Sequence, residues 1–260
     1  MALDYPTYLR LPEMLDLQHE QSSPAEHDEL LFIVIHQAYE LWFKLVLHEL
    51  DKACRDLSAN NLYGAIATFQ RVRTIMKTLV GQLDILETMT PMSFTSFRDR
   101  LDTSSGFQST QFRELEFLLG YKRRNVLHYY TEGTPAHERM MQRLTQPSIV
   151  DHFYEFLAAN GVTIPAAIRD KPADASNEPN EDVQDGLYEL YMNRPDLAIL
   201  FELMTDFDEG LQEWRYRHVK VVERTIGSKQ GTGGSPGMEF LKKSLFMSVF
   251  ADLWQIRHRL

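Results

Sequence analysis

The chain has 260 residues, of which 43% are hydrophobic and 11% aromatic, enough for one large buried core. Its formal net charge of -10 argues against a general nucleic-acid binder, which needs a concentrated basic surface. The single cysteine, Cys54, excludes an intrachain disulfide and cysteine-based metal cages, and it suits a reducing compartment. No signal-peptide pattern is expected near the N-terminus, so the composition predicts a soluble, cytoplasmic protein without nucleic acid or membrane as a partner.

The first 18 residues are predicted to form a short apolar arm. Tyr5, Tyr8 and Leu9 are followed by further leucines at roughly helical spacing. Such an arm needs a surface to dock on, because a free terminus otherwise frays. Packing on its own domain and docking on a neighbouring subunit are both open from the sequence.

Residues 32–50 are the stretch around which the chain is organised. Ser23 and Pro24, with Glu26 three residues after the serine, predict the start of a long helix. Phe32 and His36 then lie one turn apart on an apolar stripe, so His36 is expected to point inward. For this helix alone, a core histidine bonded to a neighbouring carbonyl is the simpler interpretation.

A second long helix is predicted over residues 62–89, and it ends before Pro91. In the next segment Phe94 and Arg98 are one turn apart. Arg98 therefore either shares the apolar face with an anionic partner or lies at the surface. The polar stretch 103–111 is interpreted as a loop that leads into a helix over 112–121.

The second half of the chain continues the helical pattern. One helix is predicted over 137–159, and residues 169–182 are interpreted as a surface loop rather than a domain boundary. Helices are predicted over 183–194 and 195–227. In the latter, His218 belongs to the apolar stripe, whereas Arg215 is assigned to the charged outer face.

The most glycine-rich run, residues 227–237, does not match a phosphate-binding loop, because no strand precedes it and no Gly-Lys-Ser/Thr follows its glycines. We interpret residues 228–237 as a mobile active-site loop. A helix over 238–246 is expected to follow. No alternating β-branched segments occur anywhere, so the predicted fold class is all-α, a single-domain bundle of long helices over residues 1–260.

Two histidines that face the core from different helices, His36 and His218, suggest a heme pocket in which one imidazole binds the iron and the other faces its open side. A di-iron bundle is the rival metal site. It requires Glu-x-x-His pairs, and none is in register with either histidine. Two purely structural histidines remain a third interpretation.

Five motifs in order along the chain resemble the tryptophan 2,3-dioxygenase family: FIVIHQAYELWFK at 32–44, FRD at 97–99, SSGFQSTQFRELEFLLG at 104–120, WRYRHVKVVERTIG at 214–227 and GTGGSPG at 231–237. The similarity runs through essentially the whole chain. It implies an all-helical homotetramer with one heme b per subunit. Such an enzyme uses O2 to open the indole ring of L-tryptophan and gives N-formyl-L-kynurenine.

Carried over residue by residue, the resemblance makes His218 the axial ligand of the heme iron and His36 the distal histidine that orients the indole N–H. Arg98 would bind the substrate carboxylate, and Thr232 would close over the same end. Ser105 and Gly106 match the loop along the heme edge. Substrate contacts are implied for the other matched positions: Phe32, Ile33, Val34, Ile35, Phe94, Leu101, Tyr5, Tyr8 and Leu9.

Two of these positions carry a further implication. Phe94 stands where some family members have a tyrosine, so one hydroxyl contact to the carboxylate would be missing. Tyr5 belongs to the arm, which in the family enters the pocket of a neighbouring subunit. A dioxygenase relative that adds one oxygen to a modified tryptophan in a biosynthetic pathway, and a heme-based gas-binding protein, remain alternatives. The carboxylate clamp at Arg98 argues against the gas-binding protein.

Overall fold

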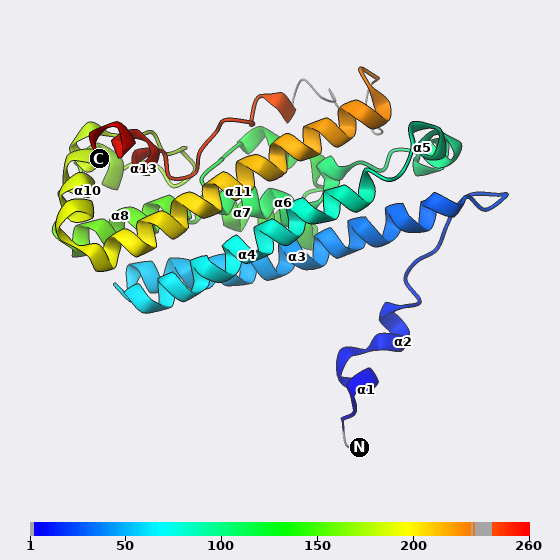
Figure 1. The fold of residues 1–260 in the computed structure, drawn as a ribbon, viewed down its shortest axis with the longest axis horizontal. Helices are drawn as coiled ribbons and strands as arrows, with labels where there is room; N and C mark the ends of the chain where they lie inside the picture. The colour runs from blue at the N-terminus through cyan, green and yellow to red at the C-terminus, as the bar shows by residue number, and fades with distance from the viewer. Residues whose placement is uncertain (1–2, 230, 232–240) are drawn as a thin grey trace.

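The structure is a computed structural model that describes residues 3–229, 231 and 241–260. Every regular element among these residues is helical, so the predicted all-α class is confirmed. Three long helices form the frame: α3 (His27–Ser58), α4 (Leu62–Leu86) and α11 (Pro195–Ile226). They extend along the long axis of the molecule, and α4 packs against both of the others (Figure 1).

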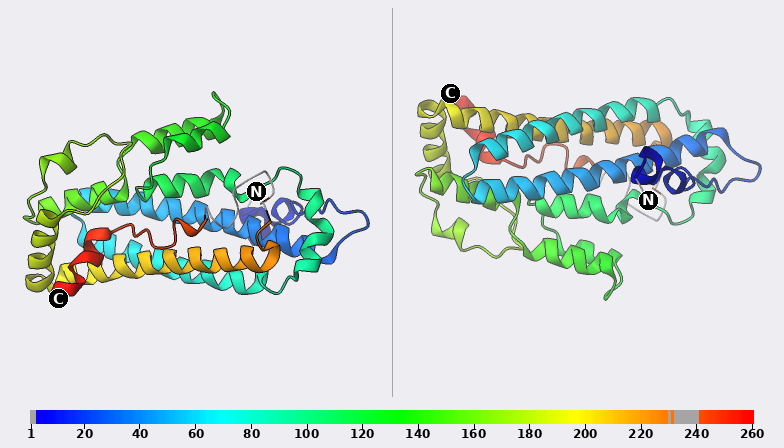
Figure 2. Two further views of the ribbon diagram at one scale, coloured as in Figure 1. Left: turned by 90° about the horizontal axis from the view of Figure 1, so that it is seen from above. Right: turned by 90° about the horizontal axis from the view of Figure 1, so that it is seen from below.

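Shorter helices cover this frame. α6 (Thr110–Leu118) and α8 (Ile149–Ala159) pack on α3, and α10 (Glu181–Asn193) packs on α11. α5 (Pro91–Arg98) lies at one end, where it contacts both α3 and α11. α7 (Pro135–Thr145) packs on α6 and splays away from the bundle (Figure 2). The remaining elements are α1 (Tyr5–Leu9), α2 (Leu11–Met14), α9 (Ala166–Arg169), α13 (Ala251–Gln255), η1 (Asp99–Leu101), η2 (Gly106–Gln108), η3 (Arg124–Tyr129) and η5 (Ile256–Arg259).

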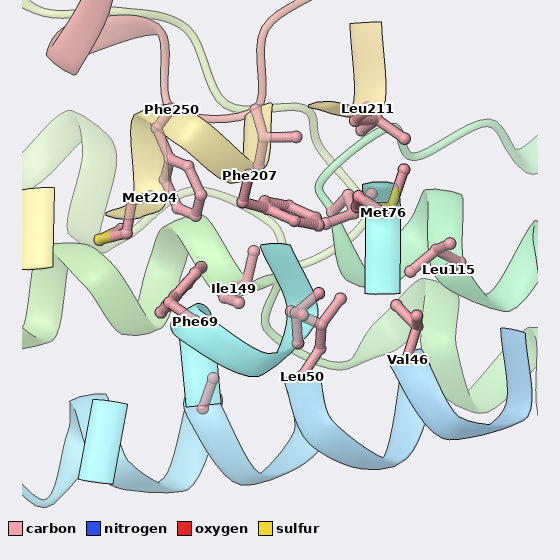
Figure 3. Close-up of a cluster of buried hydrophobic side chains, with 14 of the residues drawn as sticks. Val46, Leu50, Phe69, Met76, Leu115, Ile149, Met204, Phe207, Leu211 and Phe250 are labelled. Atoms are coloured by element: carbon pink, nitrogen blue, oxygen red, sulfur yellow. The ribbon is translucent and has the colours of Figure 1, made fainter. Parts of the chain in front are cut away.

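The main core lies between α3, α4, α8 and α11, and the C-terminal segment closes it. Each large apolar side chain buried there contributes about 1.5–3 kcal/mol relative to an exposed one. Long helices with apolar stripes are therefore held together mainly by this cluster. Figure 3 shows part of it, including Val46, Leu50, Phe69, Met76, Ile149, Phe207, Leu211 and Phe250.

The first long helix begins later than the sequence predicts. α3 starts at His27 with Glu26 at the N-cap position, and Ser23 precedes a cis peptide bond. The entering chain is held by Glu29 instead. Its carboxylate accepts hydrogen bonds from the backbone N–H groups of Gln21 (2.8 Å) and Ser22 (3.0 Å).

The single helix predicted over 137–159 is in fact two helices, α7 and α8. Pro147 disfavours helical backbone at the residue before it, and Gln146 is extended there with ψ of 153°. Ser148 then caps α8 through a reciprocal pair with Asp151, whose carboxylate accepts the Ser148 N–H at 2.6 Å. Apolar residues recur on both sides of this break, which is why periodicity alone joined the two helices.

Two other predicted segments are irregular or lie outside the described residues. Residues 170–180 form neither helix nor strand. Of the loop predicted over 228–237 and the helix predicted over 238–246, residues 230 and 232–240 are outside the described part of the chain, and Thr232 is among them.

The N-terminal arm lies apart from the bundle. α1 and α2 contain no buried residue, and they project away from the long helices (Figure 1). Tyr5 and Tyr8 are 71% and 72% exposed. The amide of Gln18 donates to the side-chain oxygen of Gln37 on α3 (2.6 Å), which ties the end of the arm to the bundle.

Among the described residues, α3 is the one helix long and apolar enough to cross a membrane by length and composition. The core helix of a soluble protein meets the same criteria. α3 packs against α4, α6 and α8, so it has the contacts of a core helix.

Candidate active site

The two histidines and Arg98 come from elements that meet at one end of the bundle. His36 lies near the N-terminal end of α3, and His218 lies toward the C-terminal end of α11. Arg98 is half-buried and is the last residue of α5, which contacts both helices. α3, α4 and α11 bring these ends together on the side where α5 lies (Figure 1).

The imidazole of His36 is neutral and has a defined tautomer. Its Nδ1 lies 2.7 Å from the carbonyl oxygen of Phe32. Because a carbonyl only accepts, Nδ1 carries the proton and Nε2 keeps its lone pair. Surrounding protein lowers the pKa of His36, and this effect outweighs the Phe32 carbonyl and Glu40, which favour the charged form. His36 is nevertheless exposed within the single chain, so the inward direction predicted from the sequence is not observed.

The imidazole of His218 is more deeply enclosed. Its ring stacks on Trp214, one turn earlier on α11, with centroids 5.3 Å apart and planes 6° from parallel. Burial, with a smaller contribution from the nearby His36, lowers the pKa of His218 to about 4. At neutral pH the ring is therefore uncharged, which is the form that binds metals. The influence of His36 on this pKa indicates that the two imidazoles are near each other.

Trp214 connects His218 to two further helices. Its ring lies 6.1 Å from that of Phe43 on α3, at 89°, and 5.3 Å from that of Phe112 on α6. Tyr39 adds a fourth ring at 6.2 Å from Trp214, and its hydroxyl donates to the carbonyl oxygen of Leu79 (2.6 Å). This aromatic wall fixes the turn of α11 on which His218 lies.

A second aromatic group lies beside His36. The Phe32 ring is 4.0 Å from the imidazole, and it contacts Phe94 (5.8 Å) and Phe97 (5.6 Å) of α5. Phe94 and Phe97 are buried, whereas Phe32 is half-buried. The arrangement offers a flat apolar surface next to a hydrogen-bond acceptor, the Nε2 of His36. An indole ring has the matching chemistry: a flat apolar body with one N–H.

The other predicted contacts of α3 point in different directions. Ile35 is buried and Ile33 is half-buried. Val34 is 45% exposed and lies about 160° around the helix from His36 at 3.6 residues per turn. Within one chain, Val34 therefore does not join His36. Leu101, in η1, is half-buried and packs against the core.

Ser105 and Gly106 lie in a separate 3-10 turn. Ser105 Oγ accepts the N–H of Phe107 (3.4 Å), and its own N–H donates to Gln108 Oε1 (3.2 Å). The Arg113 guanidinium lies over the Phe107 ring, 5.1 Å from its centroid, and holds the turn against α6. In the described part of the chain, no hydrogen bond joins Ser105 or Gly106 to either histidine.

The donor chemistry fits a heme. One neutral imidazole, His218, lies beside an aromatic surface and suits an iron that brings its other ligands within a porphyrin. Across residues 3–229, 231 and 241–260, no group of three or more His, Cys, Asp and Glu side chains is placed to hold a metal ion. The described residues thus give the di-iron alternative no carboxylate site.

A groove with a volume of about 780 Å³ lies elsewhere, between α3, α7 and α8, and neither His36 nor His218 lines it. Four of its charged side chains pair with each other: Arg143 binds both carboxylate oxygens of Asp51 (2.6 and 2.7 Å), and Arg139 pairs with Glu114 (3.2 Å). The end of the bundle with the two histidines is the better candidate site, because the Phe32 carbonyl occupies the Nδ1–H of His36 and leaves a lone pair on Nε2.

Sequence reasoning missed two features of this site. Trp214 was placed on the apolar stripe without a role, although its spacing of four residues from His218 predicts stacking contact. Arg215 was assigned to the outer face, but its side chain is buried, with 7% exposed. Its partners lie far away in sequence, so no local pattern identifies them.

An all-α bundle with two neighbouring neutral histidines, each in contact with aromatic rings, suits a heme enzyme that oxidises an aromatic substrate. The family model for tryptophan 2,3-dioxygenase matches residues 1–160 and 184–260. A tryptophan 2,3-dioxygenase of Herpetosiphon aurantiacus is 50% identical to this chain, over 98% of each sequence. Those of Anaeromyxobacter sp. strain K and Saccharopolyspora erythraea are 48% and 40% identical over 98% of this chain, and over 96% and 92% of their own lengths.

The chain belongs to the tryptophan 2,3-dioxygenase family. The family predicted from the sequence motifs is confirmed, and with it the class of enzyme: an oxidoreductase of the heme-dependent tryptophan dioxygenases.

Proposed function

We propose that this protein cleaves the C2–C3 bond of the indole ring of L-tryptophan with O2, giving N-formyl-L-kynurenine in the kynurenine pathway of tryptophan catabolism. The pairing of His36 and His218 carries the proposal. Both rings are neutral and near each other; within the described residues the Nε2 of His36 has no hydrogen bond, and His218 is stacked on Trp214. His218 would hold one heme b per subunit as the axial ligand. That cofactor, when bound, supplies the activation of O2 and the oxidation chemistry.

His36 positions the substrate by accepting a hydrogen bond. Its Nδ1–H is occupied by the carbonyl of Phe32, so Nε2 is the atom available to the indole N–H. The lowered pKa of His36 makes the ring a weak base, and the indole nitrogen is a very weak acid. Hydrogen bonding and orientation are therefore its role, rather than full removal of the proton.

The substrate is bound at both ends. Phe32 and Phe94, whose ring centroids are 5.8 Å apart, supply the apolar wall for the indole, and Ile33, Ile35 and Leu101 are the further substrate contacts in this proposal. Arg98 binds the carboxylate, because a planar guanidinium forms two parallel charge-assisted hydrogen bonds with such a group. The family resemblance assigns the same end of the substrate to Thr232, which lies outside the described residues, and the edge of the heme to Ser105 and Gly106.

The protein acts as a cytoplasmic homotetramer in which N-terminal arms are exchanged. Tyr5, Tyr8 and Leu9 have 71%, 72% and 41% of their surface exposed within one chain, and apolar surface of this kind marks protein contacts. α3 presents a second such surface through Leu30, Val34 and Leu41, at 43%, 45% and 59% exposed. The arm would complete the pocket of a neighbouring subunit, and Val34 suits the contact between subunits. The single cysteine is consistent with a reducing compartment.

One experiment separates this proposal from its alternatives. The heme-loaded protein is reduced without oxygen, L-tryptophan and then O2 are added, and the heme and product spectra are followed together. We expect the near-ultraviolet band of formylkynurenine to grow with O2 consumption. A product that gains a single oxygen atom would indicate the biosynthetic relative, and a stable O2 complex without turnover would indicate a gas-binding protein. Failure to bind heme at all would contradict the proposed function itself.

A further inference from the structure

Arg215 is a buried cation on α11 that joins three separate segments. Its Nη1 donates to the carbonyl oxygens of Met247 (2.8 Å) and Ser244 (3.2 Å) and to the hydroxyl of Tyr121 (3.3 Å). The guanidinium also lies over the Tyr121 ring, 4.6 Å from its centroid. Tyr121 in turn donates to the Met247 carbonyl (2.8 Å). One polar network thus joins α11, Tyr121 and the C-terminal segment.

In this network, carbonyl and hydroxyl oxygens take the place of the carboxylate that usually pairs with a buried arginine. Within the described residues, no carboxylate forms an ion pair with Arg215. Burying a guanidinium without an anion is costly, and the cost is offset only where good hydrogen bonds satisfy it. The carbonyl groups and the Tyr121 ring fulfil this condition. Because burying Arg215 is costly, we interpret its directional hydrogen bonds as important for the position of α11.

Arg215 is adjacent to His218 on the helix surface. At 3.6 residues per turn, two residues three positions apart lie about 60° from each other around α11. The aromatic rings around Trp214 pack on one face of this turn, and His218 itself is half-buried. The directional contacts of Arg215 hold the neighbouring face. Seven residues before Arg215, Asp208 holds the same C-terminal segment by accepting the N–H groups of Val249 (2.8 Å) and Phe250 (3.1 Å).

We propose that Arg215, together with Tyr121, is a positioning residue for His218. The inference rests on the proposed role of His218 as the heme ligand. The two contacts of the C-terminal segment, at Asp208 and at Arg215, prevent α11 from rotating about its own axis. The contact of the Arg215 guanidinium with Tyr121 then sets the distance between α11 and the segment that follows α6. The direction of the His218 imidazole follows from both.

The test compares Arg215→Gln, Arg215→Lys and Tyr121→Phe with the matched control Arg224→Gln. Arg224 is also on α11 but is exposed, and it pairs with Glu87 on the surface (2.8 Å). Removing an outer contact of a metal ligand commonly weakens metal binding 10–100-fold. We expect Arg215→Gln to release heme to a heme-free globin about tenfold faster than wild type. Arg215→Lys should behave similarly, because an ammonium lacks the planar guanidinium that lies over the Tyr121 ring. Tyr121→Phe should have a smaller effect.

Two further measurements separate positioning from general stability. The iron–histidine stretching frequency of the reduced protein should shift in the Arg215 variants and stay at the wild-type value in Arg224→Gln. In the heme-free protein, amide hydrogen exchange should become faster in α11 around His218 in the Arg215 variants alone. Circular dichroism verifies the fold. Should Arg215→Gln not fold, Tyr121→Phe decides the question, because it keeps the ring beneath the guanidinium.

Wild-type values for heme release, stretching frequency and exchange in the Arg215 variants would overturn the inference. Equal changes in Arg224→Gln would also overturn it, since they would show a general loss of stability. Full recovery in Arg215→Lys would reduce the role of Arg215 to its charge. The proposed function fails separately: in that case His218→Ala itself would keep its heme and its iron–histidine band.

Discussion

The two histidines share one chemistry, but their surroundings give them different tasks. His36 keeps accessible surface, and its Nδ1–H is used by the Phe32 carbonyl, so one nitrogen remains for a small partner. His218 is stacked on Trp214, and its helix is held on neighbouring faces by aromatic rings and by Arg215. The His36 imidazole can therefore bind a small partner, whereas the His218 imidazole is held in position by its neighbours. Changes on the α11 side should therefore alter cofactor binding, whereas changes on the α3 and α5 side should alter turnover.

The largest effect is expected on the α11 side. His218→Ala should abolish stable heme binding, because it removes the ligand proposed for the iron. The helical fold should survive, since the main core cluster does not include His218. The heme-to-protein ratio and the far-ultraviolet circular dichroism spectrum test both statements. An unchanged spectrum of the iron and its protein ligand would show that His218 does not bind the heme iron.

Deleting residues 1–10 should lower turnover of the substrate without lowering heme content. The arm is proposed to complete a neighbour's pocket, and misplacing a substrate by about 1 Å can cost a hundredfold in rate. We expect a fall of about that size in kcat/KM, with heme content close to wild type. Steady-state kinetics and the heme-to-protein ratio are measured on the same preparation. Full activity of the truncated chain would contradict arm exchange.

Arg98→Lys keeps the charge at the end of α5 but removes the planar fork. Loss of such a charge-assisted pair costs about 1.5–3 kcal/mol, or roughly ten- to a hundredfold in kcat/KM for L-tryptophan. Tryptamine, which lacks the carboxylate, is the control. Wild type should discriminate strongly against tryptamine and the variant should not. If both proteins treat the two substrates alike, Arg98 is not the carboxylate site.

His36→Ala tests the other histidine, which is expected to act on the substrate and not on heme binding. A lost neutral hydrogen bond costs about 0.5–1.5 kcal/mol, which predicts a two- to tenfold fall in kcat/KM with heme retained. The substrate 1-methyltryptophan has no indole N–H, so the variant and wild type should use it equally well. A loss of several thousandfold would instead indicate that His36 removes a proton.

A separate effect concerns the stability of the heme-free protein against pH. His218 titrates near 6.5 when unfolded and at about 4 in the folded chain. Between these values the unfolded chain binds a proton that the folded chain does not, so the free energy of unfolding falls as the pH falls. The denaturation midpoint of His218→Phe should therefore decrease less than that of wild type between pH 6.5 and 4.5. Equal decreases would show that this ring does not titrate as described.

Local patterns predicted much of this architecture. The spacing of Phe32, His36, Tyr39 and Phe43 indicated one inward stripe; in the structure Tyr39 and Phe43 are buried and Phe32 is half-buried, whereas His36 is exposed. Periodicity joined α7 to α8, because a proline and a capping serine interrupt the backbone without interrupting the apolar pattern. The role of individual site residues came from the family resemblance, since helical spacing alone left both histidines open to a structural interpretation.

Long-range partners could not be predicted in the same way. Arg215 and Met247 are 32 residues apart, and Arg215 and Tyr121 are 94 apart. Such pairs form only once the helices have been placed by their apolar faces. The sequence therefore assigned Arg215 to the outside by its charge, although tertiary contacts bring it inside.

The exposed arm formed by α1 and α2 would divide each catalytic unit between two polypeptides. Two inactive alleles could then complement each other in mixed oligomers. A chain without the arm offers an intact heme pocket, and a chain without His218 offers an intact arm. Cells that produce both would regain part of the activity, whereas cells that produce either one alone would have little or none.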